Sequence, residues 1–112
     1  MSYSANLKDA SAKDPDSTLY RTYNLLDASV GCTNGCRAGV TVFLSDEYNP
    51  AGIHGDQEGY YVLSGTGSAK INGEEIALEP EMSLIVPAGK THCLKKSPSC
   101  DGLKVFWFHA AK

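Results

Sequence analysis

The sequence predicts an all-β domain, built as an antiparallel β-sandwich or closed β-barrel. Short apolar or alternating segments, rich in β-branched and aromatic residues, follow one another from Leu19 to the end of the chain. Gly, Pro, Asn and Asp separate these segments, and none of them shows three turns of helix-period apolar spacing. Many short strands at regular intervals are typical of sandwiches and barrels.

Eight strands are expected, each bounded by turn-forming residues. In chain order they cover residues 19–26, 37–44, 58–63, 68–71, 75–78, 83–86, 91–94 and 103–109. Asn72-Gly73 predicts a hairpin, and Gly65-Thr66-Gly67 and Pro87-Ala88-Gly89 predict two further reversals. Residues 1–18 are rich in Ser, Ala, Asp and Lys, so we divide the chain into a flexible N-terminal arm, 1–18, and one β-barrel domain, 19–112.

The composition is that of an ordinary globular domain. The chain has 112 residues, of which 42% are hydrophobic and 21% are charged. A formal net charge of −3 gives no electrostatic reason to bind nucleic acid or an anionic membrane surface. No apolar run approaches the roughly 20 residues that span a bilayer, and the polar first residues lack the apolar core of a secretion signal. A cytoplasmic location is therefore expected.

The four cysteines do not define a disulfide scaffold. They are Cys32, Cys36, Cys93 and Cys100, too few to hold together a chain with a core of its own. Structural or incidental thiols are the favoured interpretation. A redox role for Cys32 and Cys36, or a metal role, remains open because spacing does not show whether the two sulfur atoms are close.

Three polar residues on or beside the expected strands, His54, Glu58 and His92, carry the chemistry. Alternate residues of a strand share a face, so Glu58 and Tyr60 point the same way. A bend between His54 and Glu58 can bring these two together, and His92 follows the Pro87-Ala88-Gly89 turn. Two imidazoles and a carboxylate can form one face of a metal site and leave positions open for water or substrate.

These residues resemble the two motifs of the cupin superfamily, and the resemblance covers roughly residues 36–109. In the first motif two histidines separated by one residue precede a glutamate, and a glycine follows seven positions later; His54, Glu58 and Gly65 match. In the second, Pro87, Gly89 and His92 match. The resemblance implies a double-stranded β-helix, or jelly roll, of the compact single-domain type.

Three positions depart from the cupin pattern. Gly52 stands where the first histidine is expected, Glu81 replaces the leading glycine of the second motif, and Lys96 replaces its closing asparagine. The metal set is thereby reduced to His54, Glu58 and His92, with lower expected affinity. Other side chains considered for the missing ligand are Tyr48, Asp56, Gln57 and His109, although His109 is better explained by a packed or hydrogen-bonded structural role.

The resemblance implies a small cupin that binds one divalent ion of Fe, Mn, Ni or Zn. It would act on a sugar derivative or carboxylic acid as an isomerase, dioxygenase or lyase, with Glu58, His92 and Tyr60 as catalytic residues. No organic cofactor is expected. The protein is expected to form a homodimer. One alternative is a metal-free cupin, either a small-molecule sensor or an acid–base sugar epimerase. Another is a purely structural cluster, whose replacement by apolar residues would leave or raise stability.

Overall fold

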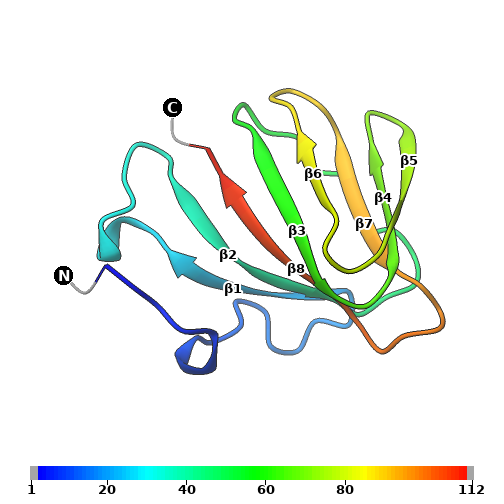
Figure 1. The fold of residues 1–112 in the computed structure, drawn as a ribbon, viewed down its shortest axis with the longest axis horizontal. Coiled ribbons are helices and arrows are strands. Elements are labelled where there is room, and N and C mark those ends of the chain that lie inside the picture. Colours follow the sequence, from blue (N-terminus) through cyan, green and yellow to red (C-terminus); the bar gives the residue numbers. More distant parts are fainter. Residues whose placement is uncertain (1–2, 111–112) are drawn as a thin grey trace.

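Two antiparallel β-sheets make up the structure, a computed structural model that describes residues 3–110 (Figure 1). All eight predicted strands are confirmed to within two residues at either end. They are β1 Tyr20–Leu26, β2 Arg37–Phe43, β3 Glu58–Ser64, β4 Gly67–Ile71, β5 Glu74–Leu78, β6 Ser83–Val86, β7 His92–Lys96 and β8 Leu103–His109. The helical elements of the described chain are the two 3₁₀ turns η1, Leu7–Asp9, and η2, Ala28–Val30.

The sheet order is that of a jelly roll. One sheet runs β1-β2-β8-β3-β6 and the other β5-β4-β7. Asn72 and Gly73 both adopt positive φ and form the predicted hairpin between β4 and β5. The predicted reversal at Gly65 instead carries the chain from one sheet to the other, since β3 and β4 do not pair. Gly65 has a φ of 83°, and a Cβ there would collide with the carbonyl oxygen of Gly102.

The space between the sheets is filled by the inward residues of both. On β8 the alternation is complete, because Leu103, Val105, Trp107 and His109 are buried while Phe108 on the opposite face is exposed. The buried apolar cluster comprises Phe43, Tyr60, Val62, Ala69, Leu78, Val86, Leu94, Leu103, Val105 and Trp107. These side chains hold the two layers together.

The N-terminal segment lies along β1 (Figure 1). The backbone N–H of Lys13 donates to the carbonyl of Thr22, which fixes the segment beside this edge strand. Residues 1 and 2 of the predicted arm lie outside the described part of the chain, and the flexibility of the remainder stays a prediction.

Two of the four cysteines differ from the favoured interpretation of free thiols. The turn before β2 carries a disulfide between Cys32 and Cys36, whose Cα atoms are 5.2 Å apart. Cys93 and Cys100 are free thiols. The two paired residues are therefore not incidental thiols in this structure.

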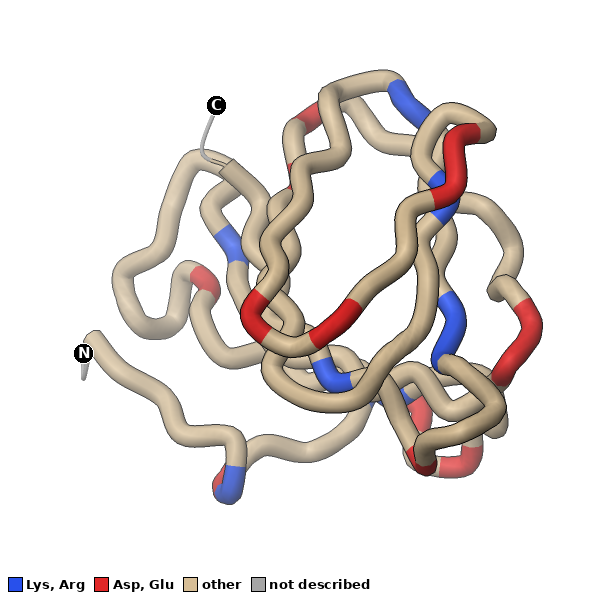
Figure 2. The backbone as a smooth tube through the Cα atoms, turned by 45° about the vertical axis from the view of Figure 1, so that its right-hand side comes forward, with Lys and Arg blue, Asp and Glu red and all other residues tan. Residues whose placement is uncertain are grey.

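Charged residues of both signs are interspersed around the backbone (Figure 2). This distribution agrees with the small net charge of the chain. Within residues 3–110, no helix has the length and apolar character needed to cross a bilayer.

Candidate metal centre

His54, Glu58 and His92 meet at one end of the barrel interior, as the motif spacing predicts. Nε2 of His54 lies 3.1 Å from Oε1 of Glu58, and Nε2 of His92 lies 3.3 Å from the same oxygen. One potential ligand atom from each residue lies within 4.8 Å of the others. Glu58 begins β3 and His92 begins β7, so neighbouring sheets supply two of the three groups.

The bend that carries His54 is fixed by the turn before β7. The backbone N–H of Gly89 donates to the carbonyl of His54 at 2.9 Å, and Gly89 has a φ of 77°. The Pro87-Ala88-Gly89 turn therefore positions two histidines, because it anchors the His54 bend and leads into the strand that begins with His92.

Gly52 borders this cluster through its backbone. It exchanges two hydrogen bonds with His92, at 2.9 and 3.0 Å, in an isolated antiparallel bridge. A Cβ added at Gly52 would lie 3.4 Å from Cε1 of His92, within ordinary contact range. The position is thus at the site and directed toward it, although glycine supplies no ligand atom.

The second departure from the motif is explained by backbone geometry. Glu81 has a φ of 73°, in the left-handed region that favours glycine, which is the residue expected there. The change therefore affects a turn and leaves the ligand set unaltered.

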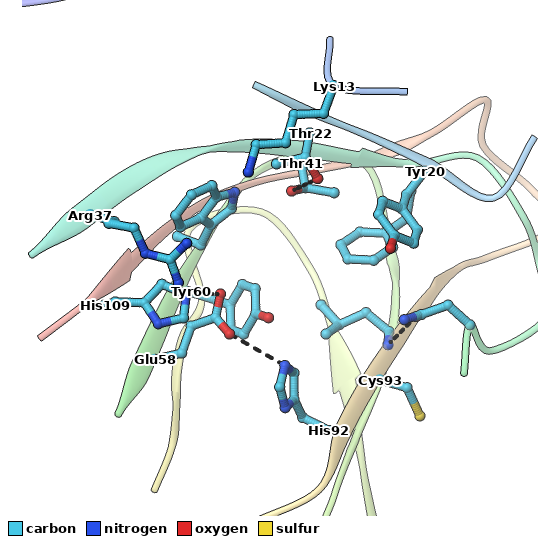
Figure 3. A pocket seen from close by; sticks show the side chains of 14 residues that line it. Lys13, Tyr20, Thr22, Arg37, Thr41, Glu58, Tyr60, His92, Cys93 and His109 are labelled. Atoms are coloured by element: carbon cyan, nitrogen blue, oxygen red, sulfur yellow. Dashed lines mark hydrogen bonds and ion pairs between the residues drawn. The ribbon is translucent and has the colours of Figure 1, made fainter. Parts of the chain in front are cut away.

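Two further residues, which the sequence offered only as candidates for the missing ligand, join the cluster. Asp56 lies between two imidazoles: its carboxylate is 2.7 Å from Nδ1 of His54 and 2.9 Å from Nδ1 of His109. His109 turns its Nε2 toward Oε2 of Glu58 at 3.3 Å (Figure 3). The expected structural, hydrogen-bonded role of His109 fits these contacts, yet its side chain also faces the candidate ligands.

His109 reaches the site because of the β3–β8 register. Glu58 on β3 pairs directly with His109 on β8, so the two side chains share one end of the barrel. The inward alternation of β8 was a usable signal for the burial of His109. No comparable signal in the sequence identified Glu58 as the pairing partner of His109, because the register between distant strands is set by the whole sheet.

The other residues considered for the missing ligand lie elsewhere. The hydroxyl of Tyr48 contacts Ser68 and donates to Glu75, and Gln57 is exposed. Cys93 directs its sulfur away from the ring of His92, as expected for adjacent strand residues (Figure 3). Asp56 and His109 are thus the additional polar groups that the structure brings to the cluster.

The electrostatics of the site keep Glu58 ionised. Burial opposes ionisation of this carboxyl group, but the imidazoles of His92, His109 and His54 outweigh it and lower the pKa. Tyr60 behaves in the opposite way, because burial and the neighbouring Glu58 carboxylate raise the pKa of its hydroxyl. The arrangement therefore combines an ionised carboxylate with a phenol that stays protonated.

A cavity of about 230 Å³ opens onto these groups (Figure 3). Glu58, Tyr60, His92, Trp107 and His109 line it. Its volume is below the roughly 300–1,000 Å³ typical of pockets for drug-sized ligands, so it suits a small molecule.

Comparison with known protein families gives one match over most of the chain. The family model described as "Cupin domain" matches residues 40–109. Among curated proteins, a mannose-1-phosphate guanylyltransferase from Escherichia coli is 29% identical over 87 residues. The match covers 78% of this chain but only 18% of that enzyme.

Solved structures share the fold at low sequence identity. The polyketide cyclase RemF from Streptomyces resistomycificus aligns with a TM-score of 0.78 at 15% identity, over 96% of this chain and 78% of that protein. HppE in its iron(II) form aligns with a TM-score of 0.76 at 15% identity, over 94% of this chain and 58% of that protein. Likeness at this level of identity establishes the architecture.

Proposed function

The chain belongs to the cupin family, and on this basis we propose that it binds one divalent metal ion through His54, Glu58 and His92 and acts on a small polar molecule. The observation that carries the proposal is the convergence of three ligand atoms from separate segments within 4.8 Å. Two imidazoles and one carboxylate suit Fe, Mn, Ni or Zn. Iron(II) HppE, which has the same fold, offers a precedent for a metal in this architecture.

The residues present fit a metal ion in their chemistry. Asp56 engages Nδ1 of His54, so Nε2 is the nitrogen presented to Glu58. A carboxylate that orients a ligating histidine in this way is the usual outer partner of a metal site. Glu58 is held in its anionic form, which is the form that ligates. A bound ion would supply Lewis-acid chemistry or an open coordination position.

The side chains of the cavity bind and orient the substrate. Tyr60 keeps its proton because its pKa is raised, so its hydroxyl serves as a hydrogen-bond donor to substrate oxygen. Glu58 or His92 acts as a base only where it is not occupied by metal. The buried walls formed by Tyr60 and Trp107 exclude bulk water from one side of the cavity. A sugar derivative or a carboxylic acid fits this combination.

A second candidate is a metal-free cupin that acts as a sensor or an acid–base epimerase. Gly52 removes one ligand of the family pattern, and the remaining groups contact the Glu58 carboxylate directly. His54, His92 and His109 each place a ring nitrogen within 3.3 Å of the Glu58 carboxylate. These contacts satisfy the Glu58 carboxylate without an ion, whereas Nδ1 of His92 has no hydrogen-bond partner among the described residues.

Elemental analysis of the purified protein separates the two candidates. The metal hypothesis predicts near-stoichiometric iron, manganese, nickel or zinc, and its loss in His92→Ala. Lys90→Ala, at an exposed position two residues away, is the matched control and should retain the metal. A metal-free protein in which His92→Ala weakens the binding of a sugar or acid would support the second candidate instead.

We further propose that the protein forms a homodimer through the outer face of the larger sheet. Tyr61, Leu63, Ile85 and Phe108 are each at least 40% exposed, and all four lie on β3, β6 or β8, adjacent strands of that sheet. Exposed apolar patches of this kind commonly mark interfaces. Sedimentation analysis of Phe108→Asp would show a monomer if this face is the contact. The cytoplasmic location also stays a proposal.

A further inference from the structure

Two cations line the cavity without an acidic partner. Lys13, from the N-terminal segment, and Arg37, at the start of β2, both direct their side chains toward it (Figure 3). Every ion pair found within residues 3–110 involves a histidine, so neither cation is paired with Asp or Glu there. The carboxylate inside the cavity, that of Glu58, is already engaged by three imidazoles.

The backbone holds both cations at the cavity. Arg37 pairs in register with His109, which places it at the polar end of the barrel. Lys13 is fixed by its own N–H, which donates to the Thr22 carbonyl at 3.0 Å, and Thr22 also lines the cavity. Strand register and a backbone anchor therefore fix the points from which the two cationic side chains extend toward the cavity.

Trp107 adds an unsatisfied donor to the same cavity wall. Its side chain is only 5% exposed, and its Nε1 has no hydrogen-bond partner among the described residues. A buried N–H without an acceptor costs free energy. An oxyanion bound beside Lys13 and Arg37 would also bring a hydrogen-bond acceptor to the cavity wall that contains Nε1 of Trp107.

We propose that Lys13 and Arg37 form an oxyanion subsite, so that the molecule taken up by the pocket carries a carboxylate or phosphate group. The planar guanidinium of arginine matches such groups through paired hydrogen bonds. The remaining polar part of the molecule then lies toward Glu58 and His92. The identity of this ligand as substrate rests on the proposed function, whereas anion binding itself does not.

The single tryptophan provides a direct test. In a ¹H–¹⁵N spectrum of the full chain, Trp107 gives one indole signal, and chelator-treated protein is titrated with malonate, inorganic phosphate or neutral malonamide. We expect a saturable shift of this signal with malonate or phosphate and none with malonamide. Comparison of the two anions distinguishes a carboxylate subsite from a phosphate subsite.

Charge-removal variants assign the effect to the two cations. Arg37→Gln and Lys13→Gln should each weaken anion binding by about tenfold or more, as expected for a lost charged hydrogen bond. Arg21→Gln on β1 and Lys8→Gln in the N-terminal segment remove equal charge outside the cavity lining and should leave affinity unchanged.

The subsite is rejected if no oxyanion moves the indole signal at tens of millimolar, if malonamide moves it equally, or if the two cavity variants bind as the controls do. These results are independent of the metal proposal. Protein that holds metal but shows no anion-specific shift overturns the subsite alone. Protein that holds no metal yet shows the shift overturns the metal proposal and retains the subsite.

Discussion

The two ends of the barrel interior are built on the same strands and have opposite character. At one end β3, β7 and β8 contribute Glu58, His92 and His109. A few residues along, the same three strands contribute Val62, Leu94 and Leu103, which are 0–2% exposed. Each strand therefore changes from polar to apolar within its own length.

This difference teaches that stability and chemistry occupy separate parts of a shared scaffold. The apolar end removes its side chains from water, which is the dominant favourable contribution to folding. The polar end gathers acids and imidazoles whose mutual contacts offset the cost of burying them, although Nδ1 of His92 has no hydrogen-bond partner among the described residues. Substitutions at the first end should change stability, and substitutions at the second should change binding.

The largest effect on folding is expected at the apolar end. Leu103→Ala leaves a cavity at a fully buried position and should lower the free energy of unfolding by about 2–5 kcal/mol. Leu63→Ala, at a position 43% exposed, is the matched control and should change it by about 0.5 kcal/mol or less. Urea denaturation measures both. Equal losses in the two variants would contradict the location of the core.

Glu58→Gln tests the polar end. It removes the anionic ligand while keeping the side-chain size, so metal affinity should fall by at least about 100-fold, since loss of outer partners alone costs about 10–100-fold. The free energy of unfolding should fall by about 1–3 kcal/mol, because three imidazoles lose their charged acceptor at a buried position. Competition with a chromogenic chelator measures affinity, with Glu74→Gln on β5 as control. If Glu58→Gln lowers the free energy of unfolding as much as Leu103→Ala does, the two ends do not differ in their contribution to stability.

Gly52→His tests whether the polar end gains metal affinity when the histidine of the family pattern is restored. The space beside His92 accepts a Cβ at ordinary contact distance, so the new imidazole should raise metal affinity by about tenfold, or about 1.4 kcal/mol. Gly52→Ala adds the Cβ without a ligand and should leave the affinity unchanged. A gain in both variants would show that backbone stiffening, and not ligation, is responsible.

The smallest effect concerns Tyr60, where the two ends meet. Its raised pKa means that the folded state disfavours tyrosinate, so its contribution to stability is fully present below about pH 10, where tyrosine ionises in an unfolded chain, and is lost as the pH rises further. Tyr60→Phe should therefore reduce the alkaline loss of stability and change it near pH 7 by about 1 kcal/mol or less. Thermal denaturation from pH 7 to pH 11 measures this, with Tyr61→Phe on the exposed face as control. An identical alkaline loss in wild type and Tyr60→Phe would contradict it.

Local patterns were sufficient to predict the strands and three members of the cluster. Turn residues such as Asn72-Gly73 act over a few positions, and strand alternation places Glu58 and Tyr60 on one face without knowledge of the partner strand. The spacing of His54, Glu58 and His92 likewise depended on recognisable motifs. These features are encoded within short segments.

The remaining members depend on contacts between distant segments. His109 meets Glu58 through the β3–β8 register, and Lys13 reaches the cavity through an arm that sequence composition marked only as flexible. Asp56 was considered as a ligand, but its position between two histidines became evident only with the fold. Register and arm placement are properties of the assembled sheets, which no single segment specifies.

The backbone bridge between Gly52 and His92 has an evolutionary consequence. Because both hydrogen bonds of this bridge come from main-chain groups, the strand geometry is maintained whatever side chain stands at residue 52. Either histidine or glycine at residue 52 is therefore compatible with the same backbone position of His92. Under the proposed function, one substitution at residue 52 would add or remove a metal ligand without rebuilding the barrel.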